Sequence, residues 1–160
     1  MSEPHHFRIR LEWPADPAQT AHPDANFSRN AILSVDGKAV VEASAPTVFG
    51  GDASRFNPEE LLIMSLADCH MLTYLAIASK RGLQVLHYAD AAEGTLAIGE
   101  FGTAGKMSMQ EVVLHPRVLV AKGTNLEEAK RMHEKAHANC FVANSVNFPV
   151  RCLADIIEAE

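Results

Sequence analysis

Alternating apolar and charged residues open the chain from Phe7 to Trp13, where FRIRLEW has the period of a strand with one face in water. Two further apolar runs, Ala31 to Val35 and Lys38 to Ala43, flank Asp36-Gly37, a dipeptide typical of tight hairpin turns. The segment from Ala45 to Phe56 has neither a strand period nor a helix period. The sequence therefore predicts an opening strand, a hairpin and a loop.

A long helix is predicted to follow this loop. Asn57 suits the N-cap, Pro58 suits the first helical position, and the two glutamates after it favour the positive end of the helix dipole. No Gly or Pro interrupts the chain from there to Lys80, and Gly82 can end the helix in a left-handed conformation. The helix is apolar almost all round from Leu61 to Ala78, which predicts burial on several sides.

The second half of the chain predicts a hairpin, a helix and a strand. Two extended runs, Gln84 to Ile98 and Lys106 to Val120, pair most simply as a long hairpin around residues 99–102. A second helix begins after a cap at Thr124 or Asn125 and runs to about Ala138. Residues 149–158 predict a closing strand, with a helix over 154–160 as the alternative. The elements together predict one α+β domain over residues 1–160.

Composition narrows the class of protein. The chain has 160 residues, of which 48% are hydrophobic, and a net charge of -6 with scattered basic residues, so we expect no nucleic-acid partner. No signal-peptide pattern opens the chain and no uninterrupted apolar run reaches the length of a membrane span, so we expect a cytoplasmic protein with no membrane partner. Three cysteines in such a compartment indicate transient, chemical disulfides rather than structural ones.

Each cysteine taken alone is typical of a protein core. Cys69 lies in the middle of the long apolar helix, Cys140 follows the second helix, and Cys152 lies in the closing strand. Burial in apolar surroundings raises the pKa of a thiol and makes it inert. From its neighbours alone, Cys152 is predicted to be core filler.

Two segments carry a resemblance to a known family. Residues 57–62, NPEELL, with Ser65, Ala67 and Cys69-His70 are similar to the central helix of the OsmC/Ohr family, the osmotically inducible and organic hydroperoxide resistance proteins. Residues 136–146, beginning AHANC, resemble that family's second-cysteine segment. His70 stands where the best-known peroxidases of the family carry an aromatic or apolar residue, which indicates a less-studied OsmC-like branch.

The resemblance implies a fold and a reaction. The fold has antiparallel sheets packed on a long central helix, in an intertwined homodimer. The reaction is the thiol-dependent reduction of organic hydroperoxides to alcohols, part of an oxidative stress response. Cys69 matches the peroxidatic cysteine, Cys140 the resolving cysteine, and Arg29 and Glu59 the catalytic arginine and glutamate. A dithiol, such as a lipoylated protein, would regenerate the enzyme, and we expect neither cofactor nor metal.

The matched residues have a chemical rationale. A thiol in mid-helix gains nothing from the helix N-terminus, so Cys69 needs a cation such as Arg29 to stabilise its thiolate. Glu59 could orient that guanidinium and accept a hydrogen bond from the substrate. Arg55 is a rival for the arginine because it is close to Glu59 in sequence, and the family placement favours Arg29. His70 points about 100° away from Cys69 around the helix and is predicted to be a neutral structural histidine.

The spacing of Glu59 and Cys69 has its own consequence. Ten residues on one helix place them roughly 15 Å apart along the axis and about 80° apart around it. Both can serve one site only if the helix bends sharply or if the glutamate comes from a second chain. We therefore predict a homodimer with shared active sites.

A metal site is the main alternative. Residues 133–137, HEKAH, match the zinc-protease pattern, although no third ligand follows at a recognised spacing. His133, His137 and Cys140 also share one helix face and could bind zinc with Cys69 as the fourth ligand. A zinc-binding, ligand-binding or stress-sensing protein on the same scaffold, without turnover, thus remains the second hypothesis.

Overall fold

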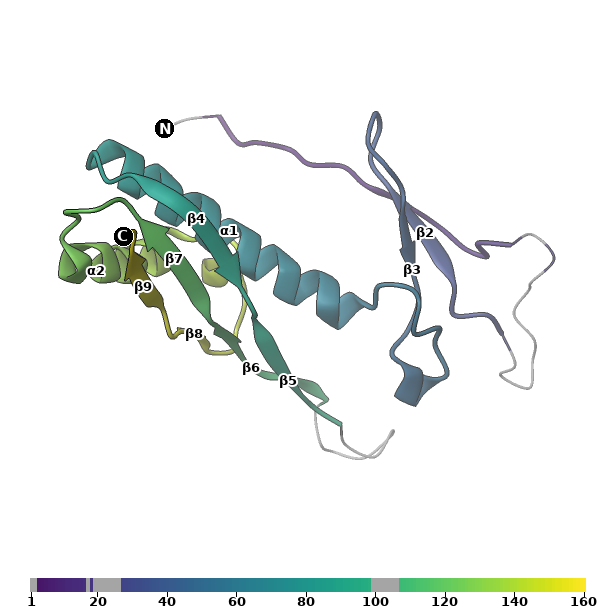
Figure 1. Ribbon diagram of the computed structural model, residues 1–160. Coiled ribbons are helices and arrows are strands. Elements are labelled where there is room, and N and C mark those ends of the chain that lie inside the picture. Colours follow the sequence, from purple (N-terminus) through teal and green to yellow (C-terminus); the bar gives the residue numbers. More distant parts are fainter. Residues whose placement is uncertain (1–2, 17, 19–26, 99–106) are drawn as a thin grey trace. The chain divides into compact units, whose positions relative to one another are not determined.

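The computed structural model describes residues 3–16, 18, 27–98 and 107–160. By their contacts these residues form two compact units, Met1–Leu61 and Leu62–Glu160. Figure 1 shows both units and labels the helices α1 and α2 and the strands β2 to β9. Each unit is described by itself below.

The first unit contains one antiparallel sheet with the strand order β1-β2-β3. Strand β1 (Arg10–Glu12) is shorter than predicted, and all three of its residues are exposed. Strands β2 (Ala31–Ser34) and β3 (Val41–Ala43) form the predicted hairpin, with Gly37 at a φ of 76° in the turn. The predicted loop after β3 contains one short 3-10 helix, η1 (Thr47–Phe49).

Helix α1 (Pro58–Lys80) has the predicted bounds. Its first turn is held by a reciprocal cap, in which the Glu60 N–H donates to Asn57 Oδ1 over 2.9 Å and the Asn57 N–H donates to Glu60 Oε2 over 3.0 Å. Its other end is closed by the Leu83 N–H, which donates to the Ala78 carbonyl over 3.0 Å across Gly82, whose φ is 68°. This is the pattern in which a left-handed glycine ends a helix.

Within its own chain, α1 buries one stripe of side chains. The fully buried residues recur every four positions, which places them on one face of the helix. They are Leu66, His70, Tyr74 and Ala78. Met64 and Leu72 on other faces are exposed, so the predicted burial on several sides is not achieved by one copy of the chain. By length and composition alone, the helix is long and apolar enough to cross a membrane, but core helices of soluble proteins can have the same length and composition.

The predicted long hairpin forms with one break in each arm. The first arm is β4 (Val85–Asp90) and β5 (Glu93–Ala97), and the second is β6 (Ser108–Leu114) and β7 (Pro116–Val120). Antiparallel pairing joins β4 to β7 and β5 to β6. The predicted connection at residues 99–102 lies outside the described residues.

The closing segment completes two sheets. Strands β8 (Val150–Cys152) and β9 (Asp155–Glu158) pair in parallel with β6 and β7, giving the orders β5-β6-β8 and β4-β7-β9. The closing strand is thus confirmed, and the alternative of a terminal helix is wrong. The sheets of this unit are mixed rather than purely antiparallel, because the closing strand runs in the same direction as its neighbours.

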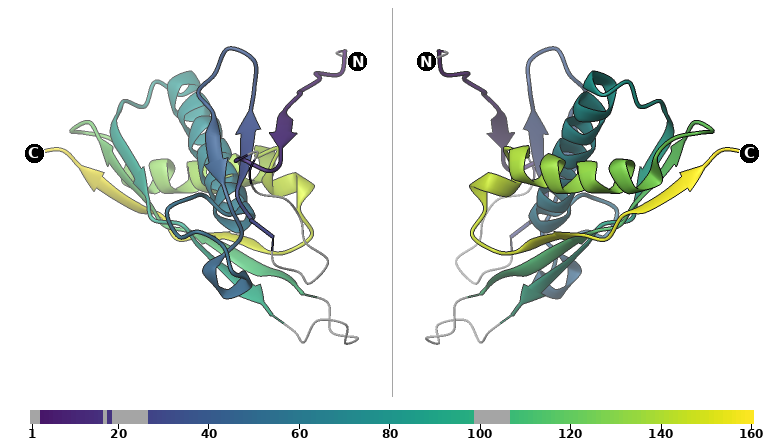
Figure 2. Two further views of the ribbon diagram at one scale, coloured as in Figure 1. Left: turned by 90° about the vertical axis from the view of Figure 1, so that its right-hand side faces the viewer. Right: turned by 90° about the vertical axis from the view of Figure 1, so that its left-hand side faces the viewer.

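Helix α2 (Leu126–Asn139) begins at the predicted cap, where the Glu128 N–H donates to Asn125 Oδ1 over 3.1 Å. A second short 3-10 helix, η2 (Ala143–Ser145), follows it. Figure 2 shows α2 and the part of α1 in the second unit on the same side of the strands. Their buried side chains meet those of β7 in one core. It contains Tyr74, Ala78, Val118, Val120, Met132 and Ala136.

The cap of α1 gives the first testable prediction. Replacing Asn57 by Ala removes the acceptor for the Glu60 N–H and should lower the free energy of unfolding by about 1 kcal/mol. Asn57→Asp keeps an acceptor oxygen and should remain close to the wild type. Urea titration followed by circular dichroism compares the two variants. Equal stability of Asn57→Ala and the wild type would contradict this account of the helix start.

Candidate active site

Cys69 lies on α1 with its side chain partly buried, between the fully buried Leu66 and His70. Its carbonyl accepts a hydrogen bond of 2.8 Å from the Thr73 hydroxyl one turn later. Cys69 lines a groove of about 690 Å³, bounded on one side by α1 and on the other by the segment that follows α2. The groove is lined by apolar side chains with a few charged ones at α1. The apolar side chains include Leu72, Ile77, Phe141 and Val142, and the charged ones are Asp68 and Lys80.

The structure brings Cys140 to Cys69. Cys140 is the C-cap of α2 and is fully buried, with its thiol next to the Cys69 side chain. Burial, and secondly the interaction with the Cys69 side chain, raises the pKa of the Cys140 thiol. Cys69 lines the groove, whereas Cys140 is fully buried. Such a pair can react with an electrophile at Cys69 and then close a disulfide.

Arg29 belongs to the first unit, where its guanidinium is held in place. Nη1 donates to the Phe27 carbonyl over 2.6 Å, and Cζ lies 4.3 Å from the centroid of the Phe27 ring. The guanidinium also packs against the backbone at Gly50, where a Cβ would lie 3.7 Å from Arg29 Cζ. The planar cation is thus oriented by a carbonyl, an aromatic face and a glycine backbone.

Glu59 and the rival arginine also belong to the first unit. Among the described residues, Glu59 Oε2 is buried and has no hydrogen-bond partner. Arg55 is paired with carboxylates, with Nη2 at 3.6 Å from Glu42 Oε1 and Nε at 3.5 Å from Asp52 Oδ2. The four predicted site residues therefore fall into two groups, Cys69 with Cys140 in one unit and Arg29 with Glu59 in the other.

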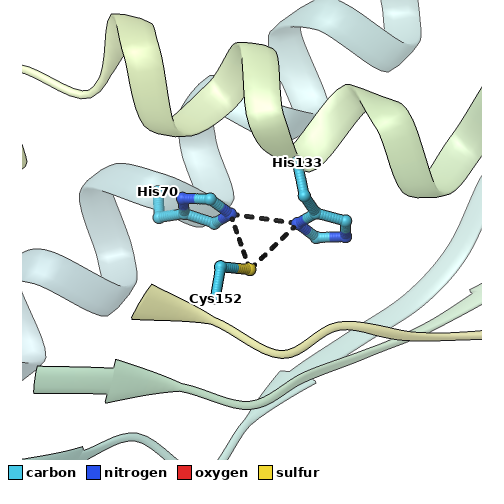
Figure 3. Close-up of side chains that lie close together, drawn as sticks. All are labelled: His70, His133 and Cys152. Atoms are coloured by element: carbon cyan, nitrogen blue, oxygen red, sulfur yellow. Dashed lines mark hydrogen bonds between the residues drawn. The ribbon is translucent and has the colours of Figure 1, made fainter. Parts of the chain in front are cut away.

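A third group of reactive side chains lies in the second unit (Figure 3). His70 Nε2 is 3.0 Å from His133 Nδ1, and Cys152 Sγ is 3.6 Å from the first nitrogen and 3.7 Å from the second. Burial lowers the pKa of His70 to about 4 and that of His133 to about 3, and it raises the pKa of the Cys152 thiol to about 12. These three are the residues of the described chain whose donor atoms converge as metal ligands do.

This group corrects two predictions made from sequence. Cys152 is not simple core filler, because its sulfur faces two imidazoles. The predicted ligand set of His133, His137, Cys140 and Cys69 does not gather among the described residues, since Cys140 lies beside Cys69 while His133 faces His70. The neutral, buried state predicted for His70 agrees with its lowered pKa. The sequence signal for the position of His70 is that it falls on the face of α1 whose buried residues recur every four positions.

Comparison with known proteins extends over most of the chain. A family model described as OsmC-like protein matches residues 51–152. The uncharacterized protein YmaD of Bacillus subtilis is 21% identical over 146 residues, covering 89% of this chain and 87% of its own.

Solved structures share the fold. An OsmC-like protein of unknown function from Vibrio cholerae superimposes with a TM-score of 0.83 at 32% identity, covering 97% of this chain and 100% of its own. An organic hydroperoxide resistance protein OsmC from Legionella pneumophila has a TM-score of 0.70 at 18% identity, covering 98% of this chain and 99% of its own. The match of the family model over more than half of the chain, together with these likenesses, shows that the chain belongs to the OsmC-like family.

Proposed function

We propose that this protein is a thiol-dependent peroxidase that reduces organic hydroperoxides to alcohols. The observation that carries the proposal is the position of Cys69, which lines an apolar groove with the buried Cys140 thiol next to it. Structural neighbours from Legionella pneumophila and Elizabethkingia anophelis are named organic hydroperoxide resistance proteins, which supports the same class of reaction.

The proposed reaction begins at Cys69. Its thiolate attacks the terminal oxygen of the hydroperoxide, the O–O bond breaks, and the alkoxide leaves as the alcohol after taking up a proton. Cys69 is then a sulfenic acid, and the Cys140 thiol condenses with it, forming a disulfide and releasing water. Because Cys140 already contacts Cys69, this second step requires little movement of the chain.

The proposed reaction has two substrates, a hydroperoxide that binds in the groove and a dithiol that reduces the disulfide. Apolar lining favours an alkyl or aryl hydroperoxide over hydrogen peroxide, because the organic group buries its apolar surface next to Cys69. A dithiol such as a lipoylated protein resets the disulfide by thiol exchange, with its own pair of thiols oxidised in turn.

Arg29 and Glu59 complete the proposed site. Arg29 stabilises the Cys69 thiolate and the developing negative charge on the leaving oxygen, and Glu59 orients the guanidinium. The buried Glu59 Oε2, which lacks a hydrogen-bond partner among the described residues, is suited to accept one from a guanidinium. Arg55 already pairs with Glu42 and Asp52, which favours Arg29 for this role.

A second copy of the chain is part of the proposed site. Glu59 and Cys69 are roughly 15 Å apart along a straight helix, so they act together most simply across a dimer. The exposed apolar residues Met64 and Leu72 of α1 provide surface for a partner to cover.

The order of the two cysteines can be tested by peptide mass mapping. One equivalent of cumene hydroperoxide should convert the reduced protein to a form with a Cys69–Cys140 disulfide. Cys140→Ser should stop at a sulfenic or over-oxidised Cys69, because the resolving thiol is gone. Cys69→Ser should leave Cys140 reduced. Unreacted thiols in the wild type, or a disulfide that involves Cys152, would contradict the proposal.

The arginine assignment can be tested with matched substitutions. Arg29→Lys keeps the charge but loses the planar fork, and should slow oxidation of Cys69 by about tenfold or more. Arg55→Lys makes the same change in the paired arginine and should stay within about twofold of the wild type. Stopped-flow measurement with cumene hydroperoxide gives both rates. The opposite ranking would transfer the role to Arg55.

The dimer can be tested by light scattering. The wild type should have twice the 17.4 kDa mass of one chain. Leu72→Glu places a charge on the exposed face of α1 and should shift the mass toward that of the monomer. Leu153→Glu is the matched control, because Leu153 and Leu72 are almost equally exposed, at 57% and 55%. This control should keep the mass of the wild type. A monomeric wild type would rule out shared sites.

A further inference from the structure

The cluster of His70, His133 and Cys152 is built from three separate elements. His70 comes from α1, His133 from α2 and Cys152 from the end of β8, and all three belong to the second unit (Figure 3). Each turns one ligand atom toward the other two, and the three atoms lie within 4.8 Å of one another. Two imidazole nitrogens and one sulfur form the mixed donor set that zinc accepts in proteins.

The spacing of the three atoms matches a tetrahedral ion. With Zn–N bonds near 2.05 Å and a Zn–S bond near 2.3 Å, tetrahedral angles place the two nitrogens roughly 3.3 Å apart and each nitrogen roughly 3.6 Å from the sulfur. The observed separations are 3.0 Å between the nitrogens and 3.6 and 3.7 Å from nitrogen to sulfur. A central ion therefore needs shifts of only a few tenths of an ångström in side-chain position.

Packing holds the ligands in this arrangement. The rings of His70 and His133 are nearly parallel, with an angle of 6° between their planes, and the ring of Tyr74 stacks on His133 at 4.1 Å between centroids. Both histidines are almost completely buried. Side chains that are already fixed lose little conformational entropy when they bind an ion.

The charges around the cluster suit a divalent cation. Desolvation keeps both histidines neutral, which leaves a nitrogen lone pair available on each ring. Asp90 lies close enough that its charge contributes to the raised pKa of the Cys152 thiol. Burial raises the pKa of the Asp90 carboxyl, and a bound cation would favour its ionised form, so that one Asp90 carboxylate and one Cys152 thiolate would balance the two charges of the ion.

A pocket of about 320 Å³ provides access to the cluster. It is lined by His133 and Cys152, together with His137, Glu134, Lys130 and neighbouring apolar residues. A water molecule entering from this pocket can occupy the fourth position of a tetrahedral site, which three protein ligands leave open.

We propose that His70, His133 and Cys152 form a zinc site that joins α1, α2 and β8, with water as the fourth ligand. This site goes beyond the proposed peroxidase function and uses none of its residues. His70 directly follows Cys69 on α1, so the bound ion would also fix the turn of the helix that carries the reactive thiol.

Cobalt(II) can serve as the spectroscopic probe for zinc at this site. The test uses the full chain with Cys69→Ser and Cys140→Ser, in which Cys152 is the remaining thiol. One cobalt ion should bind per chain, with tetrahedral d–d bands and a thiolate-to-cobalt charge-transfer band, and zinc should displace it. The absence of stoichiometric binding in this double variant would overturn the proposal and leave a hydrogen-bonded cluster.

Ligand substitutions identify the site. In the double-variant background, Cys152→Ser should remove the charge-transfer band, and His70→Asn should weaken zinc binding by at least about tenfold. Restoring Cys140 to the double variant is the matched control, and it should change neither the charge-transfer band nor the affinity for zinc. Circular dichroism of the metal-free variants checks folding. Unchanged binding after Cys152→Ser would overturn the proposal, whereas failure of Cys69 to react with hydroperoxide would leave these measurements unaffected.

Discussion

The packing of α1 against α2 is the constraint on which both clusters of reactive side chains depend. Successive residues on a helix point about 100° apart, so Cys69 and His70 cannot face the same neighbour. The burial of Leu66, Tyr74 and Ala78 fixes the rotation of α1 about its axis. That rotation aims His70 at His133 in the middle of α2 and leaves Cys69 beside Cys140 at the end of α2.

The environments of the two clusters suit different chemistry. Cys69 lines an open groove and has the buried Cys140 beside it, an arrangement that suits a reactive thiol and a resolving thiol. Cys152 is partly buried against two neutral imidazoles, and its raised pKa makes it a poor nucleophile in the absence of a metal. The proposals thus assign cysteine to redox chemistry at one end of α2 and to metal ligation near its middle.

Local sequence signals were sufficient for most of the fold. The NPEE start and the Gly82 end predicted both bounds of α1, and the Asn125 cap placed α2, because helix ends are fixed by side chains close in sequence. The parallel pairing of β8 and β9 was not predicted, since strand direction depends on partners far along the chain. The restricted burial of α1 was also missed, because an apolar helix looks the same in sequence whether its own chain or a partner covers it.

The candidate sites divide in the same way. Cys69 and Cys140 were placed together by the paired family motif, although each alone was typical of a core cysteine. The association of Cys152 with His70 could not be read from spacing, because the two residues are 82 positions apart and meet only through the packing of β8 under the helices. The HEKAH motif lies on α2, but the histidine that its His133 faces comes from α1 rather than from its own sequence neighbours.

The central claim, that Cys69 and Cys140 act as one redox pair on organic hydroperoxides, is tested most directly by stoichiometry. Reduced protein is titrated with cumene hydroperoxide while the remaining thiols and the cumyl alcohol formed are counted in the same samples. The account predicts that each equivalent of hydroperoxide consumes two of the three thiols and yields one equivalent of alcohol, and that the third thiol, Cys152, persists. Hydroperoxide that remains intact in the presence of three free thiols per chain would contradict it.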